Sequence, residues 1–198
     1  MLSDYARKIS RYFLEPLARF ISWTKVSPNV ISIIGFVLTV GVAIVIGTGY
    51  LRLGGGLIIA AGGFDALDGT LARLTQTTSR FGAFLDSTLD RFSEAVIFLA
   101  LFIHFANQGA YTELILIYMT VVGSLMVSYA RARAEGIGVA LKDGLLTRFE
   151  RMGLLVFGLI FNQVLIILWL LAIFTNFTAV QRMWLVWRIT SSEPGGQS

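Results

Sequence analysis

Residues 65–90 read DALDGTLARLTQTTSRFGAFLDSTLD, and they put four aspartates into two consecutive apolar segments. The aspartates form two pairs, Asp65 with Asp68 and Asp86 with Asp90. Because these spacings are i, i+3 and i, i+4, each pair lies on one face of an α-helix. The short polar link Thr75–Arg80 predicts that the two helices are antiparallel neighbours. We therefore expect the four carboxylates to converge at one end of a helical hairpin.

The composition of the chain predicts an integral membrane protein made of one domain. Of the 198 residues, 56% are apolar and only 14% are charged, and the mean hydropathy is +0.74. Soluble domains carry about 25% charged residues, so this composition excludes a disordered chain, a coiled coil and an ordinary soluble enzyme. The chain has no cysteine, which excludes disulfides, thiolate metal sites and cysteine nucleophiles.

The apolar segments predict an all-α fold with six transmembrane helices, since a span needs about 20 apolar residues. The predicted spans are 30–50, 53–75, 81–105, 111–133, 146–162 and 164–187. The last two require a tight turn near Asn162-Gln163, and five spans with one long final helix are the alternative. In residues 1–25 apolar positions recur at helical spacing beside a basic face, which predicts an amphipathic helix on the membrane surface.

The distribution of Lys and Arg favours six spans. With both termini in the cytoplasm, every basic residue except Arg52 falls in a cytoplasmic segment or at a cytoplasmic helix end, as the positive-inside rule requires. Five spans would place Arg182 and Arg188 outside. We therefore predict a protein of the cell membrane with its carboxylates on the cytoplasmic side. The excess of 16 basic over 12 acidic residues indicates contact with the anionic lipid bilayer, not with nucleic acid.

The four aspartates predict a metal site. Carboxylates that converge in a low dielectric cannot all stay ionised unless cations lie among them. Oxygen ligands suit Mg²⁺ or Mn²⁺, and two such ions about 3.5–4 Å apart are the usual arrangement for phosphoryl transfer. Gly69, Ala72 and Gly82 leave room for a ligand, and Arg73 can neutralise phosphate oxygens. A cation- or proton-coupled transporter is an alternative, but it would need polar groups across the bilayer, and the far halves of these spans are apolar.

The same stretch resembles the D-x-x-D-G-x-x-A-R-x8-G-x3-D-x3-D motif of the CDP-alcohol phosphotransferase family. All eight fixed positions are present: Asp65, Asp68, Gly69, Ala72, Arg73, Gly82, Asp86 and Asp90. Members of this family transfer the phosphatidyl-type group of a CDP-linked lipid to an alcohol and release CMP, and they are usually homodimers. The resemblance therefore implies a metal-dependent enzyme of phospholipid biosynthesis, with CDP-diacylglycerol or an archaeal-type CDP-linked lipid as donor.

The resemblance also implies a role for each motif residue. The metal ions and the donor's diphosphate are assigned to Asp65, Asp68 and Asp86. The nucleotide pocket is assigned to Gly69, Ala72, Arg73 and Gly82. Asp90 is the expected general base and an additional metal ligand, because a carboxylate beside a metal can take the proton of an alcohol as it attacks.

A cluster of arginines at predicted cytoplasmic helix ends indicates the acceptor: Arg131, Arg133, Arg148 and Arg182. Membrane anchoring is the simpler explanation, but grouped guanidiniums beside a metal site suit an acceptor that carries its own phosphate. The segments SYARARAEG (128–136) and TRFER (147–151) are similar to those of bacterial and archaeal phosphatidylinositol-phosphate synthases, which implies inositol 1-phosphate. Arg131 and Phe149 depart from the common Lys and Pro. A phosphatidylglycerol-phosphate synthase using glycerol 3-phosphate is the nearest alternative, and an inactive scaffold is another.

Overall fold

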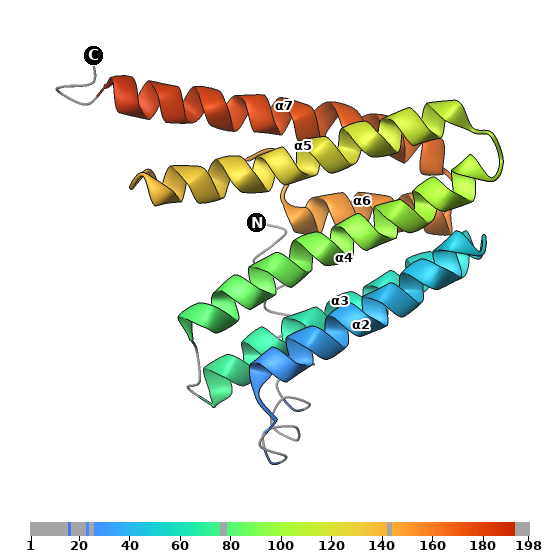
Figure 1. The fold of residues 1–198 in the computed structure, drawn as a ribbon, viewed down its shortest axis with the longest axis horizontal. Helices are drawn as coiled ribbons and strands as arrows, with labels where there is room; N and C mark the ends of the chain where they lie inside the picture. Colours follow the sequence, from blue (N-terminus) through green and yellow to red (C-terminus); the bar gives the residue numbers. More distant parts are fainter. Residues whose placement is uncertain (1–15, 17–22, 24–25, 76–78, 142–143, 193–198) are drawn as a thin grey trace. The chain divides into compact units, whose positions relative to one another are not determined.

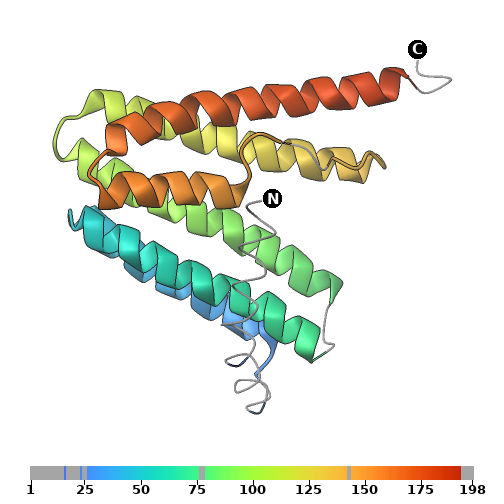
Figure 2. The same cartoon turned by 180° about the vertical axis from the view of Figure 1, so that it is seen from behind.

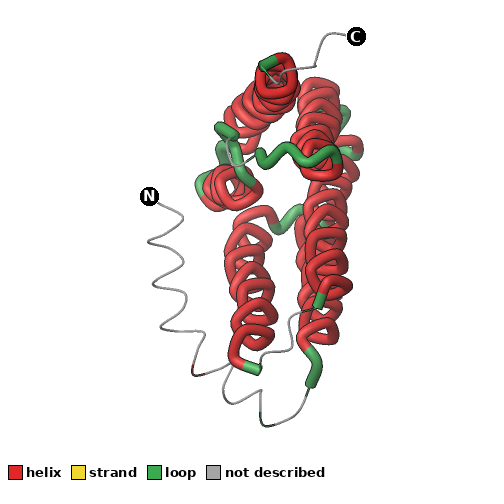
Figure 3. Tube along the Cα trace, turned by 90° about the vertical axis from the view of Figure 1, so that its left-hand side faces the viewer, coloured by secondary structure: helices red, strands yellow, loops and turns green. Residues whose placement is uncertain are grey.

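The computed structural model describes residues 16, 23, 26–75, 79–141 and 144–192. In these residues it contains α-helices and no strand (Figures 1 and 3). The helices are α2 (Pro28–Gly47), α3 (Leu51–Leu74), α4 (Arg80–Ala106), α5 (Tyr111–Gly136), α6 (Arg148–Ile160) and α7 (Val164–Ser191). The predicted all-α class is confirmed, and each predicted span corresponds to one helix. The predicted surface helix over 1–25 falls, apart from residues 16 and 23, outside the described part of the chain.

Three of the described helices are long and apolar enough to cross a membrane: α2, α5 and α7. The helices α3 and α4 have 24 and 27 residues, so they are long enough to span, but they carry the paired acids and several arginines. Helix α6 has only 13 residues, which gives about 20 Å against a hydrocarbon core of about 30 Å. The chain thus has the apolar helices of an integral membrane protein, and the count of six spans stays a prediction.

Helix α6 is shorter than predicted because capping interactions fix both of its ends. Thr147 is the N-cap and forms a capping box with Glu150, in which the Thr147 backbone N–H donates to Glu150 Oε2 at 2.7 Å. After the helix, Asn162 has a φ of 57°, a conformation that asparagine tolerates better than most residues. Gln163 N–H then donates to the Gly158 carbonyl at 2.8 Å, as in a Schellman motif. The predicted tight turn is confirmed, and the single long final helix of the five-span alternative is not formed.

The chain divides into two compact units, residues 1–104 and 105–198. In the first unit, α2 and α3 lie side by side as an antiparallel pair (Figure 1). Helix α2 also runs parallel to α4, because contacts follow one another in the same order along both. These contacts join Asn29 to Gly82, Phe36 to Phe92 with ring centroids 6.4 Å apart, and Gly47 to Ala100. Helix α2 therefore contacts both α3 and α4, the two helices that carry the acid motif.

In the second unit, α5 packs along α7, and α6 forms a hairpin with α7 (Figure 2). Small and polar residues meet at the middle of the seam between α5 and α7, which is how helices commonly associate in a bilayer. Gly123 on α5 faces the fully buried Thr175 on α7. Next to it, Asn176 Nδ2 donates to the Met119 carbonyl at 3.0 Å. These contacts fix the separation of the two helices near the middle of the seam.

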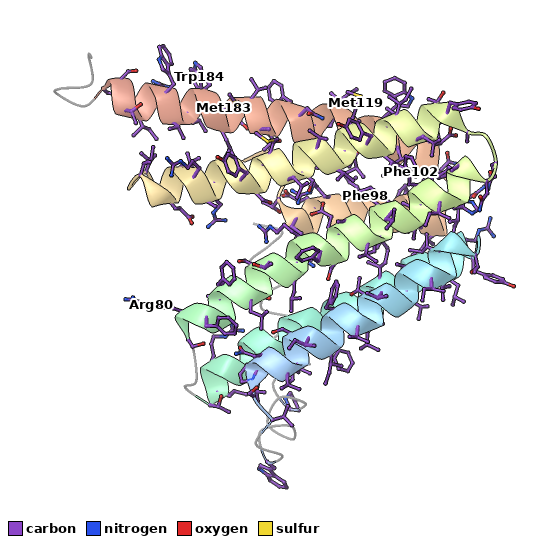
Figure 4. The ribbon with its side chains drawn as sticks, viewed as in Figure 1. Arg80, Phe98, Phe102, Met119, Met183 and Trp184 are labelled. Atoms are coloured by element: carbon purple, nitrogen blue, oxygen red, sulfur yellow. The ribbon has the colours of Figure 1, made fainter. Side chains whose placement is uncertain are left out.

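The last turns of α7 carry exposed aromatic residues. Trp184 projects from α7 on the side away from α5 (Figure 4), and the Arg188 guanidinium lies 5.5 Å from the centroid of its ring. Trp187, one turn further, is also exposed. Tryptophan and arginine in this position are typical of the boundary between lipid and water, so this end of α7 fits the edge of a bilayer.

Candidate functional site

The first acid pair lies on α3, which runs without a break through Asp65 and Asp68. The backbone therefore puts the two residues on one helix face, as predicted. The side chains of Asp65, Asp68 and Ala72 lie outside the described part of the structure. For these three residues the structure shows only the helix and their positions along it. The metal-binding role of Asp65 and Asp68 and the place of Ala72 in the nucleotide pocket stay predictions.

Gly69 and Arg73 lie on the same helix and their side-chain environment is described. Arg73 is exposed, and its Nη2 donates to Thr70 Oγ1 at 3.2 Å. Among the described atoms, only Arg73 Nη1, at 3.5 Å, comes within 4 Å of a Cβ built on Gly69. That distance is an ordinary van der Waals contact, so packing within the described chain does not require glycine here. The role of Gly69 in leaving room for a ligand stays a prediction.

The second acid pair lies in the first three turns of α4. Asp86 and Asp90 are both half-buried, and the Asp90 side chain is 17% exposed with its Oδ2 3.5 Å from Arg91 Nη1. Arg91 is held by a second contact, since its Nη1 donates to the Ser87 carbonyl at 2.7 Å. Sequence reasoning missed Arg91, because adjacent residues on a helix do not normally face each other. The only signal was the Asp-Arg dipeptide itself.

Gly82 has a packing role in addition to the predicted pocket role. Its backbone N–H donates to Ser79 Oγ at 2.9 Å, which makes Ser79 the side-chain cap of α4. A Cβ on Gly82 would lie 3.0 Å from Ser79 Oγ and 3.0 Å from Asn29 Oδ1. Glycine therefore lets the start of α2 approach the first turn of α4, from which Arg80 projects (Figure 4).

The described carboxylates of α4 fit a hard cation. Asp86 and Asp90 offer only oxygen atoms, and Glu94 follows one turn further on the same face with 5% exposure. Oxygen donors favour Mg²⁺, Mn²⁺ or Ca²⁺ over softer metals. The described side chains contain no group of three ligands that could hold an ion by themselves. A metal site that also includes the acid pair of α3 stays a prediction.

The arginines of the second unit lie in three different settings. On α5, Arg131 Nε donates to Glu135 Oε1 at 2.9 Å, and both side chains are about half exposed (55% and 52%). An exposed ion pair of this kind contributes about 0–1 kcal/mol, so an anionic ligand can replace Glu135 at little cost. Arg133 is also exposed. Measured from the buried Val127, Arg131 lies about 40° and Arg133 about 120° around the helix. Only Arg131 therefore lies close to the face that packs on α7.

Arg148 and Arg151 lie in the first turn of α6. Arg148 is half-buried, whereas Arg151 is 2% exposed and its Nη1 donates to the Leu146 carbonyl at 3.3 Å. A helix N-terminus carries a partial positive charge. The capping box therefore places two guanidiniums at the positive end of a helix dipole, which favours an anion. Arg151 was absent from the predicted cluster.

Arg182 is buried in the seam between α7 and α5. It is 5% exposed, and its Nη1 donates to the Val127 carbonyl at 2.6 Å. Val127 is one turn before Arg131 on α5. The structure thus brings Arg182 to the end of α5 that carries Arg131, although 51 positions separate the two arginines in the sequence.

Comparison with known proteins identifies the family. Residues 25–190 match the CDP-alcohol phosphatidyltransferase family. The chain belongs to this family. A member in Pyrococcus horikoshii, an archaetidylinositol phosphate synthase, is 37% identical over 188 residues, which cover 93% of this chain and 95% of the relative. The resemblance predicted from the eight motif positions is confirmed, and so is the enzyme class.

Solved structures of this transferase family have the same fold. The phosphatidylinositol phosphate synthase of Mycobacterium tuberculosis with CDP-DAG bound has a TM-score of 0.86 and 30% identity, covering 93% of this chain and 96% of that one. The same enzyme with manganese and citrate has a TM-score of 0.84, covering 93% of this chain and 92% of that one. A divalent cation and a CDP-linked lipid are thus ligands of a relative with a closely similar backbone.

Proposed function

We propose that this transferase moves the phosphatidyl-type group of CDP-diacylglycerol, or of a related CDP-linked lipid, to a hydroxyl of inositol 1-phosphate and releases CMP. The observation that carries the proposal is the combination of the complete acid motif on α3 and α4 with the arginines at the ends of α5, α6 and α7. The first set suits a metal-bound diphosphate. The second set suits an acceptor that brings its own phosphate.

The donor is assigned to the first unit. Asp65, Asp68 and Asp86 would hold Mg²⁺ or Mn²⁺ in a two-metal site, with Asp90 as a further ligand. When bound, the cations would offset the negative charge of the donor's diphosphate and of the departing CMP. The open space at Gly69 lets the nucleotide approach the α3 backbone, beside the Arg73 guanidinium that Thr70 anchors. Ala72 and Gly82 complete the nucleotide pocket.

Asp90 is assigned as the general base. The acceptor's hydroxyl oxygen attacks the lipid-bearing phosphorus, the bond from that phosphorus to the bridging oxygen breaks, and CMP leaves with that oxygen. The hydroxyl proton passes to an Asp90 carboxylate oxygen. Asp90 suits this role because its carboxylate keeps 17% exposure and has Arg91 Nη1 3.5 Å from its Oδ2, which limits the positions that the carboxylate can take.

The acceptor's phosphate is assigned to Arg131, Arg148 and Arg182 of the second unit. Arg148 has the helix N-terminus of α6 behind it, and Arg131 has only an exposed and replaceable partner in Glu135. Arg182 is fixed by its bond to Val127. The predicted fourth member, Arg133, lies off this face of α5, so we expect it to contribute general positive charge and not a direct contact.

The membrane arrangement is part of the same proposal. Six spans, a surface helix over 1–25 and both termini in the cytoplasm would place the acid motif where a soluble acceptor arrives. Because the chain has no cysteine, single-cysteine variants test this directly. A membrane-impermeant maleimide is expected to label Gln108→Cys in intact spheroplasts, and Ser192→Cys only after permeabilisation. The reverse pattern would invert the topology. The homodimer is checked by the mass of the purified protein, for which one chain contributes 21.8 kDa.

The activity is tested by CMP release from purified protein in detergent with CDP-diacylglycerol and Mg²⁺ or Mn²⁺. Inositol 1-phosphate, glycerol 3-phosphate, free inositol and serine are supplied in parallel. Metal-dependent release with inositol 1-phosphate, and little with the others, is the expected result. Release with glycerol 3-phosphate in preference would reassign the arginines to that acceptor. The absence of release with every acceptor, from folded protein, would contradict CDP-diacylglycerol as the donor and point to a related CDP-linked lipid or to an inactive scaffold.

A further inference from the structure

Gly144, in the connection between α5 and α6, lies beside the guanidinium of Arg182. A Cβ built on Gly144 would lie 2.8 Å from Arg182 Nη2, 3.1 Å from Nε and 3.3 Å from Cζ. At 2.8 Å the Cβ atom would overlap Nη2, because non-bonded carbon and nitrogen atoms stay further apart than this. These three distances place the Cβ position beyond the edge of the guanidinium that carries Nη2 and Nε, so this edge faces a backbone position where no side chain fits.

The requirement for glycine at this position is steric and not conformational. Among the described glycines, positive φ angles occur at Gly49, Gly109 and Gly138, and Gly144 is not one of them. Alanine can therefore adopt the backbone conformation of Gly144 without strain. The three nearest described atoms that a methyl group would meet at this position all belong to Arg182.

The loop cannot easily move away from Arg182, because apolar residues anchor it on both sides of Gly144. Before it, Leu141 is 4% exposed and lies in a buried cluster with Val139, against which Leu185 and Val186 of α7 pack. After it, Leu146 is 9% exposed. A methyl group on Gly144 would therefore displace the end of the arginine side chain in preference to the loop.

From these contacts we infer that Gly144 is a positioning residue for the acceptor site: its lack of a side chain lets the Nη2–Nε edge of the Arg182 guanidinium keep its position. This inference rests on the proposed function, in which Arg182 binds the acceptor's phosphate. Arginine recognises a phosphate through paired N–H groups in one plane. The Val127 carbonyl binds Nη1, and the bare backbone of Gly144 beside Nη2 and Nε leaves this edge in position before the acceptor arrives.

The test is Gly144→Ala, with Gly153→Ala as the matched control. Gly153 lies on α6, and a Cβ there meets no described atom within 4 Å. We expect Gly144→Ala to raise the KM for inositol 1-phosphate about tenfold, which corresponds to about 1.4 kcal/mol. The KM for CDP-diacylglycerol and the melting temperature stay close to the wild-type values, because only the end of one side chain moves. Gly153→Ala leaves both KM values unchanged.

A double mutant separates a positioning role from a general disturbance of the loop. Lysine at position 182 keeps the positive charge but has no planar group at the place of Nη2. In an Arg182→Lys background, Gly144→Ala is therefore expected to change the acceptor KM less than about threefold. A full tenfold effect in that background, or no effect of Gly144→Ala on the wild type, would overturn the inference.

Thermal protection by inositol 1-phosphate, without the lipid donor, distinguishes this inference from the proposed function. Wild-type protein is expected to be stabilised by the ligand, and Gly144→Ala to need a higher ligand concentration for the same stabilisation. If the wild type is active and protected but Gly144→Ala behaves identically, only the role of Gly144 is refuted. If the wild type is neither active nor protected, the proposed function fails and this inference fails with it.

Discussion

Replacing Gly123 by alanine is expected to force α5 and α7 apart. A Cβ on Gly123 would overlap Thr175 Oγ1, and it would lie 2.8 Å from Thr175 Cβ and 2.8 Å from Asn176 Nδ2. Thr175 is fully buried, so it has no free volume into which to rotate. Two carbon atoms in contact are normally about 3.5–4.0 Å apart. The helices must therefore separate by roughly 0.7–1.2 Å at this level.

This separation sets the size of the expected effect. Asn176 Nδ2 is 3.0 Å from the Met119 carbonyl oxygen, and an added 0.7–1.2 Å would take the pair beyond hydrogen-bonding distance, which costs roughly 0.6 kcal/mol inside a membrane. Overpacking costs about 1–3 kcal/mol more. Alanine in place of glycine stabilises a helix by about 1 kcal/mol, which offsets part of this loss. The net loss is about 2 kcal/mol, or roughly 4–8 °C in melting temperature for a chain of this length.

The assay is thermal unfolding of purified protein in one detergent, with Gly153→Ala as the control. The control gains the helix propensity of alanine without a clash, because a Cβ on Gly153 meets no described atom within 4 Å. It should melt at or slightly above the wild-type temperature. If Gly123→Ala melts with the control, the α5–α7 seam does not limit stability and the reasoning from Thr175 is wrong.

Three further predictions concern the chemistry. Asp90→Asn is expected to lower kcat by about 10²–10⁴-fold, the usual contribution of a general base, while binding of CDP-diacylglycerol persists; wild-type turnover would remove Asp90 from that role. Arg131→Ala is expected to raise the KM for inositol 1-phosphate at least severalfold more than Arg133→Ala does, because only Arg131 lies near the α7-facing side of α5; equal effects would contradict this orientation. Chelation by EDTA is expected to abolish CMP release and added Mg²⁺ or Mn²⁺ to restore it, whereas activity in EDTA would refute the metal requirement.

Much of this fold could be predicted from the sequence, because apolar length and helical spacing are local properties. All six predicted segments became helices, with ends that differ by at most four residues from those predicted. The motif positions from Asp65 to Asp90 were recognised by their resemblance to a family motif in residue type and spacing, and the family comparison confirms the family. The orientation of Arg133 relative to Arg131 could also have been predicted from the sequence. A continuous helix cannot place residues two positions apart on one face, and the prediction grouped Arg131 with Arg133 without applying this rule.

The remaining features depend on contacts between residues far apart in the sequence. Gly144 and Arg182 are 38 positions apart, and Gly123 and Thr175 are 52 apart. No sequence periodicity connects such pairs. The steric requirement for each glycine is therefore visible only in the three-dimensional structure. The short α6 is a different case. The Thr147–Glu150 pair is a capping box that can be recognised in the sequence. Applying this rule would have predicted a helix start at Arg148 instead of position 146.

Under the proposed function, the two kinds of charge in this transferase have separate tasks, because both substrates are anions. The diphosphate of the donor needs the cations that the acid motif would hold, together with Arg73. The phosphate of the acceptor needs its own counter-charge, since two anions that react with each other repel at short range. Changes in the acid motif should therefore affect turnover with every acceptor. Changes at Arg148, Arg182 or the Gly144 contact should alter which acceptor is preferred, so acceptor choice is expected to depend on the second unit.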